Sequence, residues 1–397
     1  MQRRIFEEEL TMKRNRAYIR HVMLARLLLA VLMTAMTASS FCSEARDSLV
    51  VDSTSAKEPA EVRFSLLIAG DLMQHMPQIK AARRRDGSYN YEECFAGIKA
   101  EVEGADVAIV NFETTLAGSP YSGYPHFSAP DDFLRGVINA GFDIMLTANN
   151  HCVDTRRKGF ERTLKMMDSL KVEHLGTYRS IEERKENYPY LLEKEGLRIV
   201  LLNFTYDTNG IPVPEPCHVN LMDTVEIAAD LEKARAMKPD IIIALPHWGI
   251  EYQTLPSKEQ KEMAAWLLEH GVDHIIGGHP HVAQPLEIRN DGRNLVAWSM
   301  GNLVSNQSDP NTYGGYMVRL DFTKCDSLTS LSDCSYTLYW VSRPTDNGYR
   351  HNYRILPIDY PDSLLTATEQ RLRGTIRKNM RQLMKEHNVG NTKEKIM

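Results

Sequence analysis

Short apolar segments alternate with longer, partly polar segments from residue 62 onward. Apolar segments rich in Val, Ile and Leu are typical of buried strands, and the amphipathic segments between them are typical of surface helices. We predict strands at residues 63–69, 107–111, 143–147, 190–195, 197–204, 241–246, 274–277 and 294–299. We predict helices at residues 91–103, 130–140, 155–170, 224–237 and 258–270. This alternation indicates an α/β fold with a buried sheet.

The pattern changes toward the C-terminus. Strands are predicted at residues 314–322 and 336–342, and residues 363–385 have the spacing of a charged, weakly amphipathic helix. We therefore divide the folded part of the chain into a main domain at residues 62–323 and a C-terminal segment at residues 324–397. The strands and helix of that segment are expected to pack on the main domain as a β/α appendage.

The N-terminus has the composition of an export signal. A basic stretch from Met12 to Arg16 precedes a twelve-residue apolar stretch from Leu27 to Ala38, and small residues follow. Twelve helical residues extend about 18 Å, which is less than the roughly 30 Å hydrocarbon core of a bilayer. Residues 1–45 are predicted to be a cleaved signal peptide, with a short N-terminal anchor as the alternative and Met12 as the expected translation start. Residues 46–61 are polar and form a linker.

Composition and charge limit the functions that need to be considered. The chain has 397 residues, of which 43% are hydrophobic and 25% charged, so it can form one large domain with an appendage. The formal net charge is -5 and the pI is near 6.2. Nonspecific binding of nucleic acid needs a clustered Lys and Arg surface, which this balance does not provide, so nucleic acid is excluded as a partner.

Six cysteines are compatible with an oxidising compartment. Cys325 and Cys334 lie near the ends of the predicted C-terminal hairpin and are the pair expected to form a disulfide, with unpaired, partly buried thiols as the alternative. Cys42 permits a lipid anchor. However, Phe41 occupies the position where a small residue precedes a lipidated cysteine, so simple secretion ranks above a lipoprotein.

Polar residues follow the first two predicted strands directly. Asp71 comes after an apolar run, and Asn111 and Glu113 come at the end of the next strand. Open α/β sheets bind their ligands beyond the carboxyl ends of the strands, so these side chains are candidate ligand groups. Each is weak evidence alone, because Gly70-Asp71 is also a common turn and a residue such as Glu113 is often solvated.

The segment Asn149-Asn150-His151, with Asp154 three residues further on, is more specific. It lies between a predicted strand and a predicted helix, so the Asn150 amide and the His151 ring are expected to share a pocket. Asp154 is placed to orient the imidazole. Helix capping explains one of the two asparagines but does not explain His151.

Histidines follow two further strands. His247 ends the strand at 241–246, and His279 and His281 follow the strand at 274–277 with a spacing that directs both rings to one side. Three imidazoles with carboxylate and amide oxygens form a mixed set of donors suited to Zn, Mn or Fe, whereas Ca or Mg prefers oxygen alone. We predict a divalent metal site for one or two ions.

Other polar residues beside these motifs are candidates for substrate binding. Glu251 and Tyr252 lie just beyond His247, where they bind substrate or support the loop. Ser299 and Asn302 follow another strand and are expected to border the site, and Asn111 is a further candidate for substrate binding. The aromatic loop at residues 121–127 borders the site or makes ordinary turn and packing contacts.

Together these motifs resemble the CapA family, which is named for capsule and poly-gamma-glutamate synthesis. The order and spacing of the motifs fit from about residue 62 to residue 322. The motifs that carry the resemblance are Gly70-Asp71, Asn111-Phe112-Glu113, Asn149-Asn150-His151, His247 to Tyr252, Gly278-His279-Pro280-His281 and Ser299 to Leu303, with Gln307 beyond them.

That family is in turn similar to the calcineurin-like metallophosphatases, which implies a four-layer α/β fold with two facing mixed sheets flanked by helices. The resemblance places Asp71, Asn150, His247, His279 and His281 on metal-ligand positions. It places His151 on the position that protonates a leaving group. Glu113 falls near the bridging carboxylate, with Asn111 as the competitor.

The chain departs from the metallophosphatase pattern at two points. Those enzymes begin with Asp-x-His, whereas here Asp71 is followed by Leu72 and Met73, and His75 comes two positions late. The position of the bridging Asp is taken by Asn111-Phe112-Glu113. The resemblance is therefore stronger evidence for the fold than for the activity.

Two functions remain open from the sequence. The first is an exported, metal-dependent hydrolase or transferase in which metal ions activate water and His151, held by Asp154, is the general acid. The second is a noncatalytic accessory or polymer-binding subunit of an envelope-polymer synthesis or export complex. Both place the chain in the periplasm or at the cell surface, with an anionic envelope polymer or its precursor as the partner and a membrane synthetase as a further one.

Overall fold

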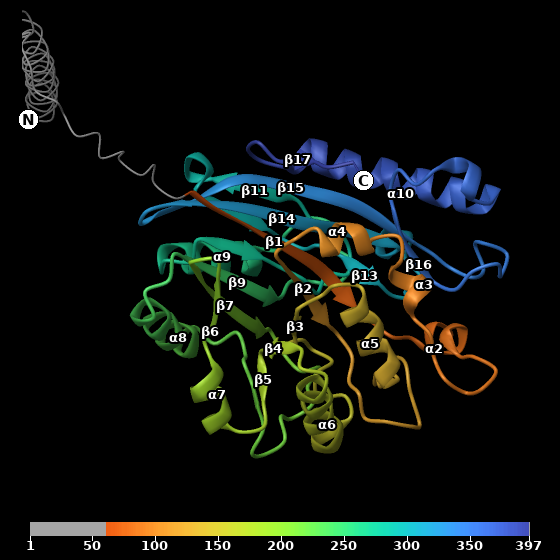
Figure 1. Cartoon of the computed structure of the whole chain (residues 1–397), viewed down its shortest axis with the longest axis horizontal. Helices are drawn as coiled ribbons and strands as arrows, with labels where there is room; N and C mark the ends of the chain where they lie inside the picture. Colours follow the sequence, from red (N-terminus) through yellow and green to blue (C-terminus); the bar gives the residue numbers. More distant parts are fainter. Residues whose placement is uncertain (1–60, 397) are drawn as a thin grey trace, which may run out of the picture. The chain divides into compact units, whose positions relative to one another are not determined.

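The computed structural model describes residues 61–396, which belong to one compact unit, Pro59–Met397 (Figure 1). The predicted signal or anchor and residues 46–60 of the predicted linker lie outside the described residues, whereas Glu61, the last residue of that linker, begins β1. The larger of two mixed sheets has the strand order β16-β15-β14-β1-β2-β3-β4, with β13 beside β1 and β17 beside β15. Its strands are β1 (Glu61–Leu72), β2 (Val107–Phe112), β3 (Ile144–Leu146), β4 (Glu173–Leu175), β13 (Asn302–Val304), β14 (Gly314–Cys325), β15 (Leu328–Ser342), β16 (Arg354–Pro357) and β17 (Lys393–Glu394).

The smaller mixed sheet has the order β11-β12-β10-β9-β7-β6. Its strands are β6 (Tyr190–Lys194), β7 (Leu197–Thr205), β9 (Ile241–His247), β10 (His274–Ile276), β11 (Leu286–Arg289) and β12 (Asn294–Ala297). A separate two-stranded ribbon pairs β5 (Thr177–Tyr178) with β8 (His218–Val219). In the larger sheet β1 to β4 run parallel, and in the smaller sheet β7, β9, β10 and β12 do so.

Helices occupy the connections between strands. They are α2 (Met76–Ala82), α3 (Glu92–Phe95), α4 (Lys99–Glu103), α5 (Asp131–Asn139), α6 (Arg156–Ser169), α7 (Ile181–Asn187), α8 (Thr224–Ala236), α9 (Lys258–Glu269) and α10 (Ala367–His387), with short 3-10 turns η1 (Asn290–Gly292), η2 (Pro310–Thr312) and η3 (Asp362–Leu364). Helices α9 and α10 each begin with a capping box, Ser257 with Gln260 and Thr366 with Glu369.

Alternation along β1 shows how the layers form. Leu66 and Ile68 belong to the hydrophobic cluster that joins the two sheets, while Leu67 and Ala69 belong to the cluster under α3 and α5. Successive residues of a strand face opposite sides, so the larger sheet is covered on both faces around β1. Helices α8 and α9 contribute to the first cluster from the side of the smaller sheet. The predicted four-layer α/β architecture is confirmed.

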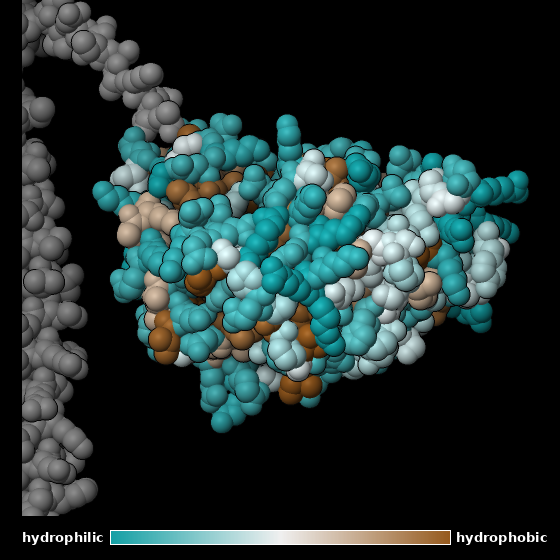
Figure 2. All heavy atoms as spheres, turned by 90° about the horizontal axis from the view of Figure 1, so that it is seen from below, coloured by the Kyte–Doolittle hydropathy of each residue, from teal (hydrophilic) through white to brown (hydrophobic). Residues whose placement is uncertain are grey.

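The face of the molecule shown in Figure 2 is mostly hydrophilic. On the face shown in Figure 2, apolar side chains appear singly or in small groups among hydrophilic ones. No helix within residues 61–396 combines the length and apolarity needed to cross a membrane.

The helix predicted at residues 91–103 is wrong as one element, because it is divided into α3 and α4. Gly97 lies at the break, where a Cβ would be 2.4 Å from the Ile355 carbonyl oxygen of β16. This close approach of a strand distant in sequence ends the first helix. Several short elements were not predicted at all, including α2, α7 and β13, because two to seven residues carry too little periodicity.

The predicted disulfide between Cys325 and Cys334 is wrong. Cys325 pairs with Leu328 across the β14–β15 hairpin, whereas Cys334 pairs with Leu320, and both thiols are free. Five residues of strand separate the two register positions, or about 17 Å, while a disulfide requires Cα atoms within about 7 Å. The hairpin is longer than predicted, and this length moves the cysteines apart. Strands β15 and β16 continue the larger sheet, and α10 lies along β15 (Figure 1).

His274 in β10 gives the fold a pH dependence. Its Nδ1 accepts a hydrogen bond from the Leu295 N–H at 3.2 Å, and burial lowers the pKa of the imidazole from 6.5 to about 4. The unfolded chain therefore binds a proton more readily than the folded one below pH 6.5. Stability is lost as the pH falls from 6.5 toward 4. For this histidine alone the loss between pH 8 and pH 5 amounts to about 2 kcal/mol.

We expect the His274→Asn variant to lose about 2 kcal/mol less of its free energy of unfolding than the wild type between pH 8 and pH 5. Asparagine can still accept from the Leu295 N–H but does not titrate. Urea unfolding at both pH values measures the difference, and the other buried histidines contribute equally to both proteins. Equal pH dependence of the two proteins would contradict the assignment.

Candidate metal centre

The two sheets meet where β1, β2 and β9 end. Asp71 lies near the end of β1, Asn111 near the end of β2, and His247 at the end of β9. Asn111 Nδ2 lies 2.7 Å from Asp71 Oδ1 and 3.3 Å from His247 Nδ1, so this amide joins the two sheets. The carboxyl ends of parallel strands thus bring distant polar residues to one point, as predicted.

A glycine places Asp71. The register of β1 against β2 shifts between Ala69 and Asp71, and a Cβ on Gly70 would lie 1.9 Å from the Gly301 carbonyl oxygen. The Asp71 N–H donates to that same oxygen at 3.0 Å. Any larger residue at position 70 would push β1 away from residue 301, so the Gly-Asp sequence is required by close packing and is more than a turn.

The Asp71 carboxylate is fully buried and links three motifs. Oδ1 accepts a hydrogen bond from Asn111, and Oδ2 accepts one from the His279 N–H at 3.1 Å. Oδ2 also lies 3.3 Å from His281 Nδ1. Asp71 therefore fixes the position of the His279–His281 turn as well as offering oxygen atoms to the site.

Glu113 is a buried carboxylate without adequate partners. It is fully buried, and its Oε1 has no hydrogen-bond partner. This oxygen lies 3.7 Å from His247 Nε2 and 3.7 Å from His281 Nε2. Burial, and then the negative charges of Asp71 and Glu251, raise the pKa of Glu113 well above its usual value. An ionised carboxylate in this position needs a cation beside it.

Two histidines of the site, His247 and His279, are held neutral. Burial lowers the pKa of His247 well below its usual value, and the neighbouring imidazoles lower it further. The pKa of His279 is lowered in the same direction by the same causes. The ring centroids of these two residues are 4.8 Å apart. Neutral imidazole is the form that binds metal ions.

The turn that carries His279 and His281 has an unusual backbone. Both residues have positive φ, 99° and 59°, which is the left-handed region that non-glycine residues rarely adopt. Gly278 precedes them because a Cβ there would lie 2.7 Å from Asp71 Oδ1. Strain of this kind costs on the order of 1–3 kcal/mol per residue and persists where the surrounding structure holds it, commonly at functional sites.

Asn302 orients the ring of His281. The Asn302 Nδ2 group donates to the Thr312 carbonyl at 3.2 Å and to Gln307 Oε1 at 2.7 Å, so its Oδ1 is the atom that faces His281 Nδ1 at 3.0 Å. Because Oδ1 can only accept, Nδ1 of His281 carries the proton. The free electron pair of His281 is therefore on Nε2.

Asn150 lies between His247 and the cavity wall. Its Oδ1 is 2.9 Å from His247 Nε2, and its Nδ2 donates to Asn209 Oδ1 at 3.2 Å. Its neighbour Asn149 donates to the Phe112 carbonyl at 3.0 Å and accepts from the His151 N–H at 3.2 Å. The first asparagine thus anchors the loop, and the second presents an oxygen to the site.

His151 forms a tight pair with Asp154. The distance between His151 Nδ1 and Asp154 Oδ2 is 2.8 Å, and the same oxygen accepts the Phe127 N–H at 2.7 Å. The Phe127 ring contacts the imidazole edge-on, with centroids 4.6 Å apart. Asp154 thus holds the Nδ1–H tautomer and leaves Nε2 for the cavity.

The donor atoms fit a divalent cation. Within the described residues, Asp71, Glu113 and His281 offer ligand atoms within 4.8 Å of one another, and so do Glu251, His279 and His281. Glu113 Oε1 and His279 Nδ1 are buried without hydrogen-bond partners. Buried polar atoms are nearly always paired, so these two atoms point to a missing positive partner. The mixture of nitrogen and oxygen favours Zn, Mn or Fe.

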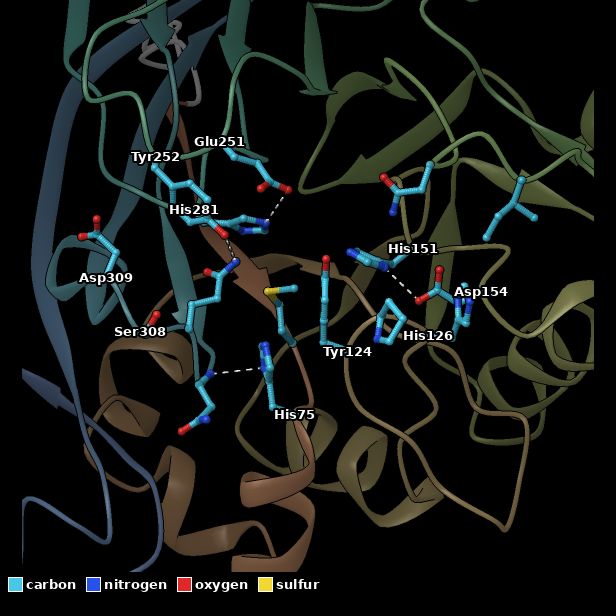
Figure 3. Close-up of a pocket in the computed structure, with 16 residues that line it drawn as sticks. His75, Tyr124, His126, His151, Asp154, Glu251, Tyr252, His281, Ser308 and Asp309 are labelled. Atoms are coloured by element: carbon cyan, nitrogen blue, oxygen red, sulfur yellow. Dashed lines mark hydrogen bonds and ion pairs between the residues drawn. The ribbon is translucent and has the colours of Figure 1, made fainter.

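The site opens into a cavity of about 860 Å³. Figure 3 shows His281, Glu251 and Tyr252 on one side of this cavity and His151 with Asp154 on the other, with His75 and Tyr124 between them. His75 accepts from the Asn306 N–H at 3.2 Å through Nδ1, and burial lowers its pKa to about 4. His75 lines the cavity and belongs to neither group of candidate ligands.

The residues predicted to bind substrate fall into two groups. Glu251 and Tyr252 line the cavity. Ser299 and Asn302 are fully buried: the Ser299 hydroxyl donates to the Val282 carbonyl at 2.9 Å, and Asn302 contacts His281. Asn111 is also buried, among the ligand candidates. These three support the site and do not face the cavity, which corrects the predicted substrate contacts.

Three contributors were not predicted. Asn149 anchors the His151 loop, Asn209 holds Asn150, and the Tyr206 ring lies 4.4 Å from the His279 ring. Tyr206 and Asn209 follow the strand β7, so the same strand-end argument that found Asp71 could have found them. The turn residues around them gave no chemical signal.

Two facing mixed sheets with amide, carboxylate and imidazole donors at the carboxyl ends of their strands define a four-layer α/β protein with a candidate metal centre. The family model of the bacterial capsule synthesis protein PGA_cap matches residues 65–307. The chain belongs to this family, which confirms the resemblance seen in the sequence.

The relatives and solved structures are distant. The capsule biosynthesis protein CapA of Bacillus anthracis is 26% identical over 326 residues, which cover 78% of this chain and 73% of that protein. The PGA biosynthesis protein CapA of Bacillus subtilis (strain 168) is 26% identical over 200 residues, or 50% of this chain and 52% of that protein. The calcineurin-like phosphoesterase YfkN of Bacillus subtilis has a TM-score of 0.41 and 17% identity over 82% of this chain and 99% of that chain. The NAD nucleotidase of Haemophilus influenzae has a TM-score of 0.43 and 12% identity over 82% and 68%.

Proposed function

We propose that the protein is an exported, metal-dependent hydrolase or transferase that acts in the synthesis of capsule or another envelope polymer. One observation carries the proposal. Buried donor atoms without partners, Glu113 Oε1 and His279 Nδ1, lie in the same site as the paired His151 and Asp154, beside one cavity. A site that only stabilised the fold would not need an imidazole and carboxylate pair facing an open cavity.

The metal would be held by Asp71, Glu113, Asn150, His247, His279 and His281. When bound, a divalent ion supplies Lewis acidity that polarises a substrate oxygen and makes water a better nucleophile at neutral pH. The chain itself supplies orientation and proton transfer. Asp154 fixes the proton on His151 Nδ1, so His151 Nε2 exchanges a proton with the leaving group on the cavity side.

Substrate and location follow from different arguments. The cavity, of about 860 Å³, can hold part of a polymer or its precursor. An anionic group of that substrate would face the metal ligands. The basic and apolar stretches at residues 12–38 support export to the periplasm or cell surface. Membership of the PGA_cap family supports work on an envelope polymer beside a membrane synthetase or export complex.

The accessory role is the second candidate. Met73 occupies the position of the histidine in the Asp-x-His pattern, which favours a site with reduced metal binding. In that case the chain would bind the polymer without cleaving it.

The metal content of the purified full-length chain tests the proposal. We expect one to two transition-metal ions per chain by elemental analysis and slow hydrolysis of p-nitrophenyl phosphate or its diester. Removal of the ions with a chelator should abolish hydrolysis, and Mn²⁺ or Zn²⁺ should restore it. A chain that binds metal but cleaves none of these esters would favour the accessory role, and a chain without affinity for metal would refute the proposed site.

A further inference from the structure

We propose that Glu251 is itself a metal ligand and completes the coordination of the ion that His281 binds. This inference rests on the proposed metal site. The sequence led us to expect Glu251 as a substrate contact or a support for its loop, and the structure also places it beside candidate metal ligands. Its carboxylate belongs to a group of donors with His279 and His281 whose atoms lie within 4.8 Å of one another.

The free electron pair of His281 is directed toward two carboxylates. Asn302 fixes the proton of His281 on Nδ1, so Nε2 carries the free pair. Nε2 lies 3.7 Å from Glu113 Oε1 and 4.0 Å from Glu251 Oε1. When ionised, each of these carboxylate oxygens therefore faces a nitrogen that carries a free electron pair. Such an arrangement is repulsive unless a cation lies between the atoms.

The distances are those of ligands around one ion. Nitrogen and oxygen ligands bind Zn at about 2.0–2.2 Å, so two ligands of one ion are about 3 Å apart at a right angle and about 4 Å apart when nearly opposite. The separations of 3.7 Å and 4.0 Å fall within this range. Glu251 thus needs no rearrangement of the backbone to reach the ion.

The loop of Glu251 is fastened to the histidine turn. The Tyr252 N–H donates to the Pro280 carbonyl at 2.8 Å, and the Trp248 N–H donates to the Gly278 carbonyl at 3.1 Å. Tyr252 has a φ of 66°, so the backbone beside Glu251 is held in the left-handed region, like that of His279 and His281. The two loops therefore form one rigid support, and the carboxylate on it is positioned by the same contacts as the imidazoles.

Glu251 supplies a donor that the first strand lacks. Asp71 is followed by Leu72 and Met73, so the first strand supplies one ligand where two were expected. Glu251 supplies a carboxylate from the other sheet in compensation. With Glu251 in the set, the ion at His281 has a carboxylate beside the imidazoles of His279 and His281, and this donor set favours Mn or Fe more than an all-histidine set does.

Titration of the metal-free, full-length chain with Mn²⁺, followed by calorimetry and by the electron paramagnetic resonance of free Mn²⁺, tests this role without any assay of activity. We expect Glu251→Gln to weaken one binding step by at least about 10-fold. Asp309→Asn is the matched control, because Asp309 lines the same cavity, loses the same charge and is outside the donor groups. Glu251 has a side chain 43% exposed, so we expect the metal-free variant to keep the melting temperature of the wild type.

Each outcome decides a separate point. Weakened binding by Glu251→Gln alone supports ligation. Equal binding by Glu251→Gln and the wild type overturns the role of Glu251 and leaves the proposed function standing. If Asp309→Asn weakens Mn²⁺ binding as much as Glu251→Gln does, the role of Glu251 is also overturned, because the loss of any negative charge in the cavity then explains the result. A wild-type chain that binds no Mn²⁺ overturns the metal site as a whole.

Discussion

Replacing Asp71 with asparagine is expected to lower the affinity of the chain for a divalent metal by more than about 100-fold. Loss of a residue that only supports a ligand typically costs 10–100-fold, and Asp71 both offers an oxygen and holds the histidine turn. Its two oxygens accept from Asn111 and from the His279 N–H. An amide can accept only one of these hydrogen bonds, so the other donor is left facing an NH₂ group.

In the metal-free fold the unpaired donor is destabilising, and a second effect of the same substitution offsets this loss. Asp71 raises the pKa of the buried Glu113, so removing its charge relieves repulsion between two buried carboxylates. We therefore expect the metal-free variant to unfold near the wild-type temperature while losing the stabilisation that metal provides. That stabilisation is about 2.7 kcal/mol when the free metal is 100 times its dissociation constant.

Thermal unfolding with and without Mn²⁺ separates the two effects. Asp106→Asn is the control, since Asp106 accepts hydrogen bonds from the Ser65 N–H and hydroxyl at the other end of β1. This control should be destabilised but should keep its response to metal. An Asp71→Asn chain that is stabilised by Mn²⁺ as much as the wild type would show that Asp71 is structural.

The ligand candidates could be identified from the sequence because their position at strand ends is a property of the topology. Asp71, Asn111 and His247 each end a parallel strand, and parallel strands deliver their ends to one edge whatever the details of packing. His279 and His281 follow the same rule. The sequence therefore predicted which side chains gather, although it did not predict the distances between them.

The supporting residues could not be predicted in this way. Asn302 contacts His281 only because β13 runs beside β1, and β13 has three residues with no periodic signal. Gly97 breaks a helix because β16 passes over it, a contact between residues more than 250 positions apart. Both cases depend on tertiary contacts that local pattern does not contain, and such contacts override local propensity.

The wrong prediction of a disulfide between Cys325 and Cys334 has a similar cause. Both were placed near the ends of a hairpin whose length the sequence underestimated, since the polar residues at the start of β15 read as loop. Exposed and partly exposed side chains alternate with one another there, so one face of the ribbon is solvated and the hydrophobic signal of a strand is lost. The register of the hairpin then decides the distance between the thiols.

Replacing His151 with asparagine is expected to reduce the hydrolysis rate by about 10²–10⁴-fold while leaving the metal affinity unchanged. His151 is paired with Asp154 and is absent from the donor groups around His281. The loss should depend on the leaving group. A p-nitrophenyl group leaves without a proton, whereas an alkyl alcohol needs one, so an alkyl phosphate should lose far more rate than p-nitrophenyl phosphate.

Comparing kcat for the two substrates in wild type and variant measures this difference. His126→Asn is the control, because His126 is an exposed histidine that lines the same cavity without an Asp154-like partner among the described residues. Asp154→Asn should show the same preference as His151→Asn to a smaller degree, since an amide no longer stabilises a protonated imidazole. Equal losses for both substrates would mean that His151 positions the substrate and does not transfer the proton. This follows because the benefit of protonating the departing oxygen grows with the basicity of that oxygen.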